Sequence, residues 1–521
     1  MTRVFYDIID VYFKIVGWEV MTMTNYETQQ QEFENNIASV ISEDVRQISE
    51  TFDSLYDAKR SSDILPTIDL ALAMLKQNRN KPTEMQINYN IANGYHDLRE
   101  LSQEKEDSYL EKEIYHLRVV LDIYERHFFD EDGISENAES KVARYIAMRS
   151  YTNIGNAMRV SGRYIAAINY FQDALQISDD FSMASLNLSF LLFRYAQMQI
   201  RPYERDYYHH ACFHYYEQTK AYRINLESQS YLEDLEKIIQ QFAPTYIDNY
   251  LKKPLNLPIF DVDDQAEADY RNFILMSRLF LDPCLDILSA HCFAVDSINL
   301  PFGENPDKKQ LEFIGLFNQI KQEYNLARYL WYSVSTDTHI PGFPDQELDL
   351  LDTGDYADHS LKESLLRTAF KSAYSLFDRI GFFINQYYQV GLPPAKVSFK
   401  NVWKSELRNE KGDMYYTVSH PIVDTHKKNP LVKAMYWLQK DFFEKKTMNI
   451  TSPSAEPIFQ MRNDMEHNCL RTGIDGCCAD FTKYTSCDII EDNTYKLLHL
   501  ARELIIYLCL SISYELRTSD L

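Results

Sequence analysis

The stretch YTNIGNAMRVSGRYIAAINYFQDALQIS, residues 151–178, predicts two antiparallel helices joined by a tight turn. Gly155 and Ala174 carry little or no side chain, so they let the two helices approach closely. Phe171 is placed to fill the gap that remains between them, and Gly162 and Tyr164 form and cover the turn. The fold prediction for the whole chain starts from this packed helix pair.

This spacing resembles that of one tetratricopeptide repeat (TPR), a helix pair that stacks on further copies of itself. One pair leaves apolar faces uncovered, so at least three units are expected. The segments INYNIANGYHDL (87–98) and LNLSFLLFRYAQ (186–197) resemble the first helix of further repeats more loosely. A generic helical bundle is the alternative. If the array exists, its concave face suits a protein or peptide ligand.

Composition extends the helical prediction to all 521 residues. Glycine and proline number only 14 and 17, so few turns and sharp stops interrupt the helices. We predict an all-α protein, in which a TPR-like helical-repeat solenoid precedes a helical bundle. The expected segments are a helical N-terminal extension (1–60), TPR-like helical repeats (61–250), a proline-richer helical connector (251–307) and a C-terminal helical bundle (308–521).

Long stretches with helical apolar periodicity predict five helices for the C-terminal bundle. They cover residues 309–334, 360–391, 429–445, 454–473 and 493–517. Between the first two lies PDQELDLLDTGDYADH (344–359), which is acidic but lacks the glycine and glutamate spacing of a calcium loop. We therefore expect a solvated loop there.

The charge balance limits how the chain could meet nucleic acid. A net charge of −24 repels nucleic acid on average, so an RNA substrate would need a locally basic site. The stretch Lys396–Lys446 contains eleven Lys/Arg against six Asp/Glu, a balance of +5 (11 − 6). That stretch lies in the predicted C-terminal bundle.

The eight cysteines show no regular disulfide framework. A cluster that is close in sequence consists of His467, Cys469, Cys477, Cys478 and Cys487, but it lacks two paired C-x2-C units, so zinc is not expected. The apolar first twenty residues include Asp7, Asp10, Lys14 and Glu19, charges that the apolar region of a signal peptide would not tolerate. We expect a cytoplasmic protein without membrane contact.

The segment IFQMRNDMEHNCLRTG (458–473) carries the candidate site. A helix predicted from about Ala455 to Arg471 would turn Asn463, His467 and Arg471 toward one face. Arg462 lies about 140° around this helix from His467, because each residue advances about 100°. A second copy of the helix could bring its own residues alongside. The opposite, apolar stripe would consist of Ile458, Met461, Met465 and Cys469.

These residue types suit RNA cleavage that needs no metal ion or cofactor. Histidine titrates near neutral pH and transfers protons, and arginine binds phosphate oxygens through its forked guanidinium group. Asn463 can hold a phosphate or ribose oxygen. The alternative is an ordinary polar helix surface, on which Arg462 pairs with Glu466, and Asp464 with His467.

The polar residue after Arg462, followed by His467, resembles the signature of the HEPN superfamily. Further blocks in the same order resemble its subgroup that joins TPR-like repeats to a C-terminal HEPN ribonuclease domain. These blocks are EYNLARYLWYS (323–333), LLRTAFKSAYSLFDRIGFFINQYY (365–388), KVSFKNVW (396–403), NPLVKAMYWLQKDF (429–442) and EPIFQMRNDMEH (456–467).

The resemblance implies a metal-independent endoribonuclease that acts as a homodimer or higher homo-oligomer, often in bacterial defence against phage. Arg462 and His467 would form the catalytic pair. Asn463 would be the supporting polar residue, Glu466 fits the subgroup pattern, and Arg471 joins the predicted substrate-binding set through its helix face. The TPR-like region would sense infection or restrain cleavage.

Three charged residues on otherwise apolar helices, Glu323, Arg328 and Asp378, favour ion pairs that hold the bundle or orient Arg462. The competing hypothesis for the whole chain is a non-catalytic TPR/HEPN scaffold that binds a protein partner. The net charge of −24 favours this second hypothesis.

Overall fold

A computed structural model describes the chain from residue 35 to residue 519, with gaps. The gaps are 103–106, 130–136, 224–225, 227–228, 256–261, 288–294, 339, 347, 352–356, 358, 409–413, 418–421, 423–425, 427, 443–450 and 473–481. The apolar start of the predicted extension 1–60 lies outside the described residues. The rest of the protein is mostly helical, which confirms the predicted fold class.

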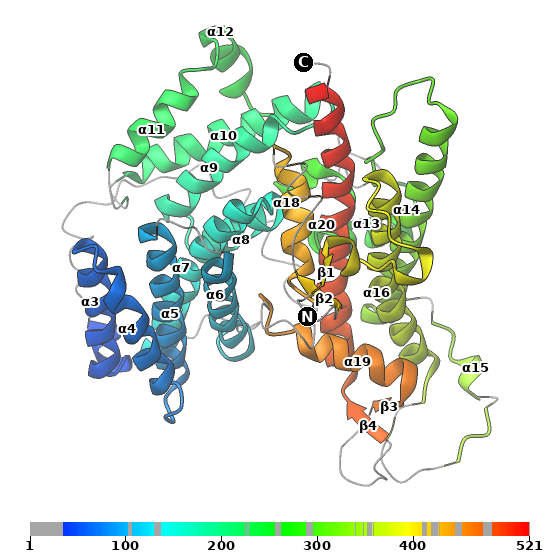
Figure 1. Cartoon of the computed structure of the whole chain (residues 1–521), viewed down its shortest axis with the longest axis horizontal. Helices are drawn as coiled ribbons and strands as arrows, with labels where there is room; N and C mark the ends of the chain where they lie inside the picture. The colour runs from blue at the N-terminus through cyan, green and yellow to red at the C-terminus, as the bar shows by residue number, and fades with distance from the viewer. Residues whose placement is uncertain are drawn as a thin grey trace.

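The N-terminal half is a stack of paired helices (Figure 1). The most extensive pairings join α5 with α6, α7 with α8, and α9 with α10. The helices are α3 (Glu43–Asp57), α4 (Ser61–Met74), α5 (Lys81–Leu101), α6 (Asp107–His127), α7 (Ala138–Ser161), α8 (Tyr164–Ile177), α9 (Ser182–Ala196), α10 (Pro202–Ala221), α11 (Gln229–Ile239) and α12 (Pro244–Tyr246).

The α7–α8 pair packs as residues 151–178 predict. A Cβ atom on Gly155 would lie 2.6 Å from the ring of Phe171, so only glycine fits this contact without movement. Gly162 ends α7 in the left-handed conformation, with φ of +84°, which favours glycine. The predicted turn and close approach are both confirmed.

The weaker repeat-like segment on α5 packs differently. A Cβ atom on Gly94 would lie 2.7 Å from Phe52 of α3 and 2.9 Å from Ile68 of α4. Gly94 therefore packs against the two helices that precede it, α3 and α4, whereas Gly155 packs against the helix that follows it, α8. Paired helices are stacked here, and their assignment to the TPR family stays a prediction.

A connector links the two halves. It contains a π-helical turn (Ile247–Leu251), α13 (Gln265–Met276) and the 3-10 turn η3 (Pro283–Asp286). Asp286 is fully buried and accepts a hydrogen bond of 2.5 Å from the Arg502 guanidinium group. This ion pair fastens the connector to the C-terminal half.

The C-terminal half contains all five predicted helices. They are α14 (Lys308–Ser335), α16 (Leu361–Tyr387), α18 (Pro430–Gln439), α19 (Ala455–His467) and α20 (Cys487–Ser519), with the short α15 (Phe343–Gln346) between the first two. By length and composition α20 could cross a membrane, but 83% of its most apolar window is buried inside the protein, as in a core helix. It packs against α14, α16 and α18.

Two small sheets were not predicted. Strands β1 (Ser405–Arg408) and β2 (Met414–Thr417) pair antiparallel, and β3 (Cys469–Thr472) and β4 (Thr482–Thr485) pair parallel. Each strand has four residues, too few to show an alternating pattern that stands out from the helical periodicity around it.

The two halves meet at buried ion pairs. Arg163, just before α8, donates to both carboxylate oxygens of Glu503 on α20 at 2.9 and 2.7 Å, and to Asp441 at 2.7 Å. Arg118 of α6 also donates to Asp441, at 3.0 Å, and to the Thr451 carbonyl oxygen at 3.1 Å. Burial alone would raise the pKa of Asp441, but the two guanidinium groups outweigh it and hold this pKa well below its usual range.

Candidate functional site

Helix α19 carries the predicted catalytic residues. Ile458 and Met461 are buried against the bundle and fix the orientation of the helix. The helix ends at His467, because Asn468 adopts an extended backbone and its side chain donates to Asp464 at 2.7 Å. The start of this helix agrees with the sequence prediction, and so do Ile458, Met461 and the partly buried Met465 of the predicted apolar stripe, whereas Cys469 lies on a strand beyond the helix.

The predicted helix end is wrong. Residues 469–472 form strand β3, which pairs with β4, and the buried Leu470 and Thr472 anchor the strand. Arg367 of α16 donates to the Leu470 carbonyl oxygen at 2.6 Å. Arg471 therefore does not share a helix face with Asn463 and His467, because strand pairing replaces the last helical turn.

Arg462 is half-buried and faces α16. Its guanidinium carbon lies 5.9 Å from the centre of the Tyr374 ring, and its Nη1 donates to Asn463 Oδ1 at 3.2 Å. A cation over an aromatic face is attracted to it, so Tyr374 and Asn463 together orient the guanidinium group. Asn463 therefore contacts Arg462, and its predicted supporting role stays a prediction.

Asp378 of α16 interacts electrostatically with Arg462. Desolvation raises the pKa of the Asp378 carboxyl group, while the Phe399 N–H, which donates to it at 3.2 Å, and the charges of Arg462 and Lys400 oppose this rise. Burial likewise raises the pKa of Tyr374, and Arg462 opposes it. Asp378 therefore accepts a hydrogen bond from the Phe399 backbone and also interacts electrostatically with Arg462.

Glu466 and His467 lie on the exposed end of α19. Glu466 pairs with Lys371 of α16 at 3.4 Å, and both side chains are about 40% exposed, so the pair adds little stability. Within the described part of the chain, neither Arg462 with Glu466 nor Asp464 with His467 forms the ion pair that an ordinary polar surface would use. These side chains have other neighbours.

Arg462 and His467 do not converge within one chain. Five helical positions separate them by about 7.5 Å along the axis and about 140° around it. Arg462 faces α16, and His467 is exposed to solvent. A phosphate group held by both would need movement of a side chain or residues from a second chain. Their catalytic role stays a prediction.

The other charged residues on the apolar helices have different roles. Glu323 of α14 pairs with Arg379 of α16 at 3.5 Å. Arg328 is buried and donates to both oxygens of Asp296 at 2.9 and 2.7 Å, and to Asn325 at 2.9 Å. Among the three, Asp378 alone has an interaction with Arg462 that the structure records.

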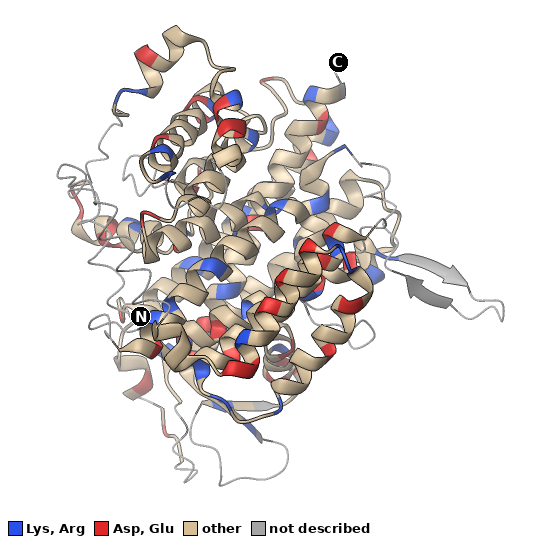
Figure 2. Ribbon diagram, turned by 90° about the vertical axis from the view of Figure 1, so that its left-hand side faces the viewer, with Lys and Arg blue, Asp and Glu red and all other residues tan. Residues whose placement is uncertain are grey.

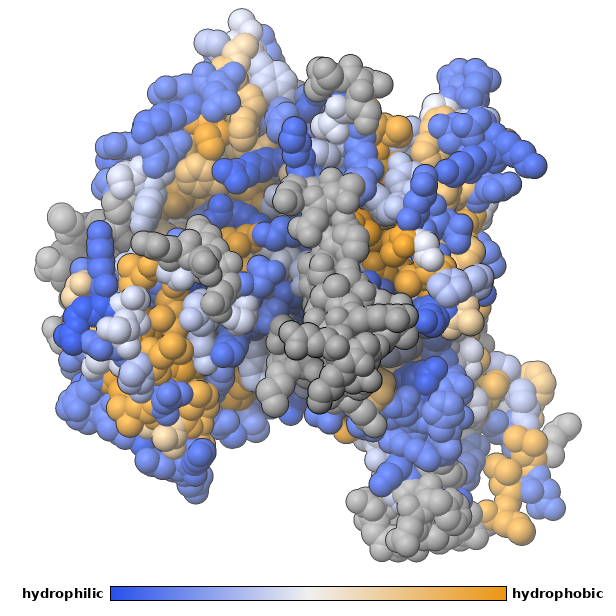
Figure 3. Space-filling view, in the orientation of Figure 1, coloured by the Kyte–Doolittle hydropathy of each residue, from blue (hydrophilic) through white to orange (hydrophobic). Residues whose placement is uncertain are grey.

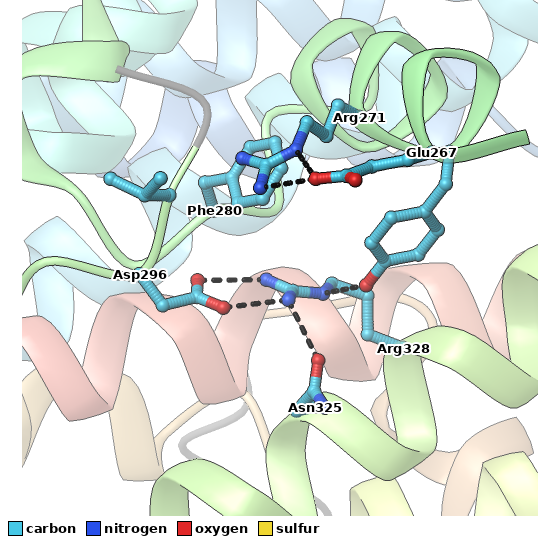
Figure 4. Close-up of a pocket in the computed structure, with 8 residues that line it drawn as sticks. Glu267, Arg271, Phe280, Asp296, Asn325 and Arg328 are labelled. Atoms are coloured by element: carbon cyan, nitrogen blue, oxygen red, sulfur yellow. Dashed lines mark hydrogen bonds and ion pairs between the residues drawn. The ribbon is translucent and has the colours of Figure 1, made fainter. Parts of the chain in front are cut away.

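Arg328 and Asp296 line a pocket of about 350 Å³ between α13 and α14 (Figure 4). Opposite them, Arg271 pairs with Glu267 at 2.7 Å. Arg328 and Arg271 each already have a carboxylate partner. We therefore interpret the pocket as part of the packing between the connector and the bundle. It is separate from α19.

Among the described residues, no group of three or more His, Cys, Asp and Glu side chains could hold a metal ion. Cys477 and Cys478 of the cysteine-rich segment lie outside those residues. Cys487 begins α20. The prediction about zinc therefore stays a prediction.

Sequence reasoning missed three neighbours of the site on α16 and beyond. Lys371 and Tyr374 contact Glu466 and Arg462, and Lys400 lies 5.4 Å from the centre of the Phe459 ring. Lys371, Tyr374 and Asp378 are spaced i, i+3 and i+7, so they lie on one side of α16, away from its buried apolar residues. That spacing was the available signal.

Residues 305–515 match the LA2681-like HEPN family, and this part of the chain is an LA2681-like HEPN domain. The matched range includes α14, α16, α18 and α19. The paired N-terminal helices lie outside it, and no repeat family matches them. Comparisons with curated proteins and with solved structures give no match.

Proposed function

We propose that this chain is a metal-independent endoribonuclease whose HEPN domain cuts RNA with Arg462 and His467. HEPN is a family that includes ribonucleases, and the matched range contains both residues. The observation that carries the proposal is the placement of α19. The helix is anchored by buried residues, holds Arg462 over Tyr374, and presents His467 to solvent.

The chemistry assigns each group one role. His467 takes the proton from a ribose 2′-OH, whose oxygen then attacks the adjacent phosphorus. Arg462 binds the phosphate oxygens and stabilises the added negative charge, with Asn463 holding its guanidinium group. The bond from phosphorus to the 5′ oxygen breaks, and that oxygen receives a proton from His467 of a second chain. The products are a 2′,3′-cyclic phosphate and a 5′ hydroxyl.

A second chain is part of this proposal because one chain offers one histidine on α19. A homodimer with two-fold symmetry would supply both the base and the acid. The same proposal assigns the TPR-like helices to sensing or restraint and the whole protein to a cytoplasmic defence or toxin-like role. Glu466 and Arg471 stay candidate substrate contacts.

The test uses purified full-length protein, total RNA and a chelator. We expect fragments that end in cyclic phosphate, and their loss in His467→Ala and in Arg462→Ala. His359→Ala is the matched control, because His359 is an exposed histidine of the same domain outside α19. Cleavage that survives in purified His467→Ala would contradict the proposal.

The second candidate function is a non-catalytic scaffold that binds a protein partner. The net charge of −24 favours it, since that field opposes RNA binding outside the local basic stretch. It predicts that the wild-type protein and His467→Ala leave RNA equally intact while both retain one protein partner. Metal-independent cleavage by the wild type decides against it.

A further inference from the structure

A short segment between α14 and α16 exposes a concentration of apolar side chains. Phe343, Leu348, Leu350 and Leu351 are 68%, 58%, 55% and 86% exposed. We name residues 343–351 the arm. It projects beside α15 at the lower right of Figure 1, where the space-filling view shows hydrophobic atoms (Figure 3). Clustered exposed apolar groups mark interaction surfaces.

The arm is also acidic and is fixed at its base. Residues 343–359 contain six Asp/Glu and no Lys/Arg. Both carboxylate oxygens of Asp345 accept the Leu361 N–H, at 3.0 and 2.9 Å, which ties the arm to the first residue of α16. A surface that receives the arm must therefore be both apolar and basic.

The middle of α16 offers such a surface. Phe382 is 39% exposed, and the side chain of Arg379, one turn earlier, is 53% exposed although it pairs with Glu323 of α14 at 3.5 Å. From Lys371 to Lys404 the chain has five Lys/Arg against one Asp/Glu, a balance of +4 (5 − 1) in a protein of net charge −24. This stretch also borders Arg462 through Asp378.

The arm cannot reach this surface on its own chain. Leu361 and Phe382 lie on one helix, and the rise between them is about 32 Å. The chain from Asp345 to Leu351 spans at most about 21 Å when fully extended. Because Asp345 is held beside Leu361, the tip of the arm falls short, and a second copy must provide the surface.

We propose that the arm docks on the Arg379–Phe382 surface of a second copy of this chain, and that two exchanged arms form a symmetric dimer. When the two-fold axis is perpendicular to α16, the two copies of this helix run antiparallel. If Leu361, at the base of one arm, lies opposite residue 381 of the second copy, the two-fold axis passes midway between them, near residue 371. Lys371 contacts Glu466, the neighbour of His467, so the exchange brings the two His467 residues together. Only this last consequence rests on the proposed function.

The test measures the dimer dissociation constant of the full chain by sedimentation. Leu350→Asp with Leu351→Asp should raise it about tenfold or more, because charged groups replace the apolar contact. Leu311→Asp is the matched control, since Leu311 is 55% exposed on α14 outside the arm. Arg379→Glu should weaken the dimer as well, and adding Asp349→Arg should restore it by reversing both charges.

A wild-type chain that stays monomeric at every concentration overturns the proposal. A dimer that the arm variant and Arg379→Glu both leave intact overturns it too. His467→Ala should dimerise like the wild type, so loss of cleavage with an intact dimer bears on the proposed function alone. A disulfide between Leu351→Cys in one copy and Phe382→Cys in another, absent from the wild type, supports the predicted contact.

Discussion

Arg163 and Arg462 occupy opposite kinds of environment. Arg163 lies between the two halves of the protein, is fully buried, and meets Asp441 and Glu503 at hydrogen-bond distance. Arg462 is half-buried on α19, and the described residues bring no carboxylate into an ion pair with it. Both arginines sit among aromatic and acidic neighbours, but only one has its charge matched.

The difference separates a charge that holds the fold from one that is available for an anion. A buried arginine without carboxylates would be costly, so each of its donors at the junction is satisfied. A phosphate-binding arginine needs the reverse arrangement, with orientation supplied by Tyr374 and Asn463 and the donors left for substrate. Figure 2 shows acidic and basic residues interspersed over the helices, so charge alone does not mark the site.

The largest effect is expected from Arg163→Met, which tests whether Arg163 stabilises the fold. It leaves Glu503 buried without its cation, and we expect the free energy of unfolding to fall by about 3–5 kcal/mol. Denaturant unfolding measures this loss. Replacing Glu503 by Gln in the same chain should recover part of it, while Asp441 keeps its partner Arg118. No change in Arg163→Met would show that the junction is not stabilising.

The next largest effect is expected from Arg462→Lys. Lysine keeps the charge but loses the forked donors, so RNA cleavage should fall about a hundredfold while unfolding changes by less than about 0.5 kcal/mol. Initial rates of cleavage and denaturant curves on the same preparation measure both. An equal loss of stability would place Arg462 with Arg163 as a structural residue.

Gly155→Ala tests the close packing of α7 against α8. The added Cβ would lie 2.6 Å from the Phe171 ring in a packed interface, and we expect a loss of about 1–3 kcal/mol. Phe171→Leu in the same chain should relieve part of it, which thermal unfolding can report. Since α7 leads directly to Arg163, a cleavage rate that survives this variant would show that the site tolerates a weakened helix pair.

A pair of histidines gives the smallest expected effect. Burial, with the charges of Arg502 and Arg278, lowers the pKa of His499 to about 3, whereas His467 is exposed. Below about pH 6.5, the ordinary pKa of histidine, the unfolded chain therefore binds a proton at His499, whereas the folded chain keeps this imidazole neutral. Stability should fall as pH drops below about 6.5, by about 2 kcal/mol at pH 5. His499→Phe should flatten this slope and His467→Ala should not, as unfolding curves at each pH can show.

Local patterns predicted much of the fold. Gly155, Gly162 and Phe171 were sufficient for the α7–α8 pair, because close approach and a left-handed turn limit which residues can be used. The five bundle helices followed from long apolar periodicity. Periodicity did not give the partner of each helix, so the packing of Gly94 against α3 and α4 could not be foreseen.

The candidate site was predictable in part. The helix that carries Arg462, Asn463 and His467 was predicted from apolar periodicity, and the roles of these three residues stay predictions. Arg471 was misplaced because strand pairing with residues 482–485 ends the helix, and such pairing depends on a distant segment. The contacts of Lys371 and Tyr374 likewise depend on how α16 packs.

The bond from Arg118 to the Thr451 carbonyl oxygen has a consequence for synthesis of the chain. Arg163 leaves the ribosome 278 residues before Asp441 and 340 residues before Glu503, and Arg118 precedes Asp441 by 323 residues. Until those carboxylates emerge, the nascent N-terminal helices hold arginines that must stay hydrated. The segment leading into α19 is fixed only when both halves are present.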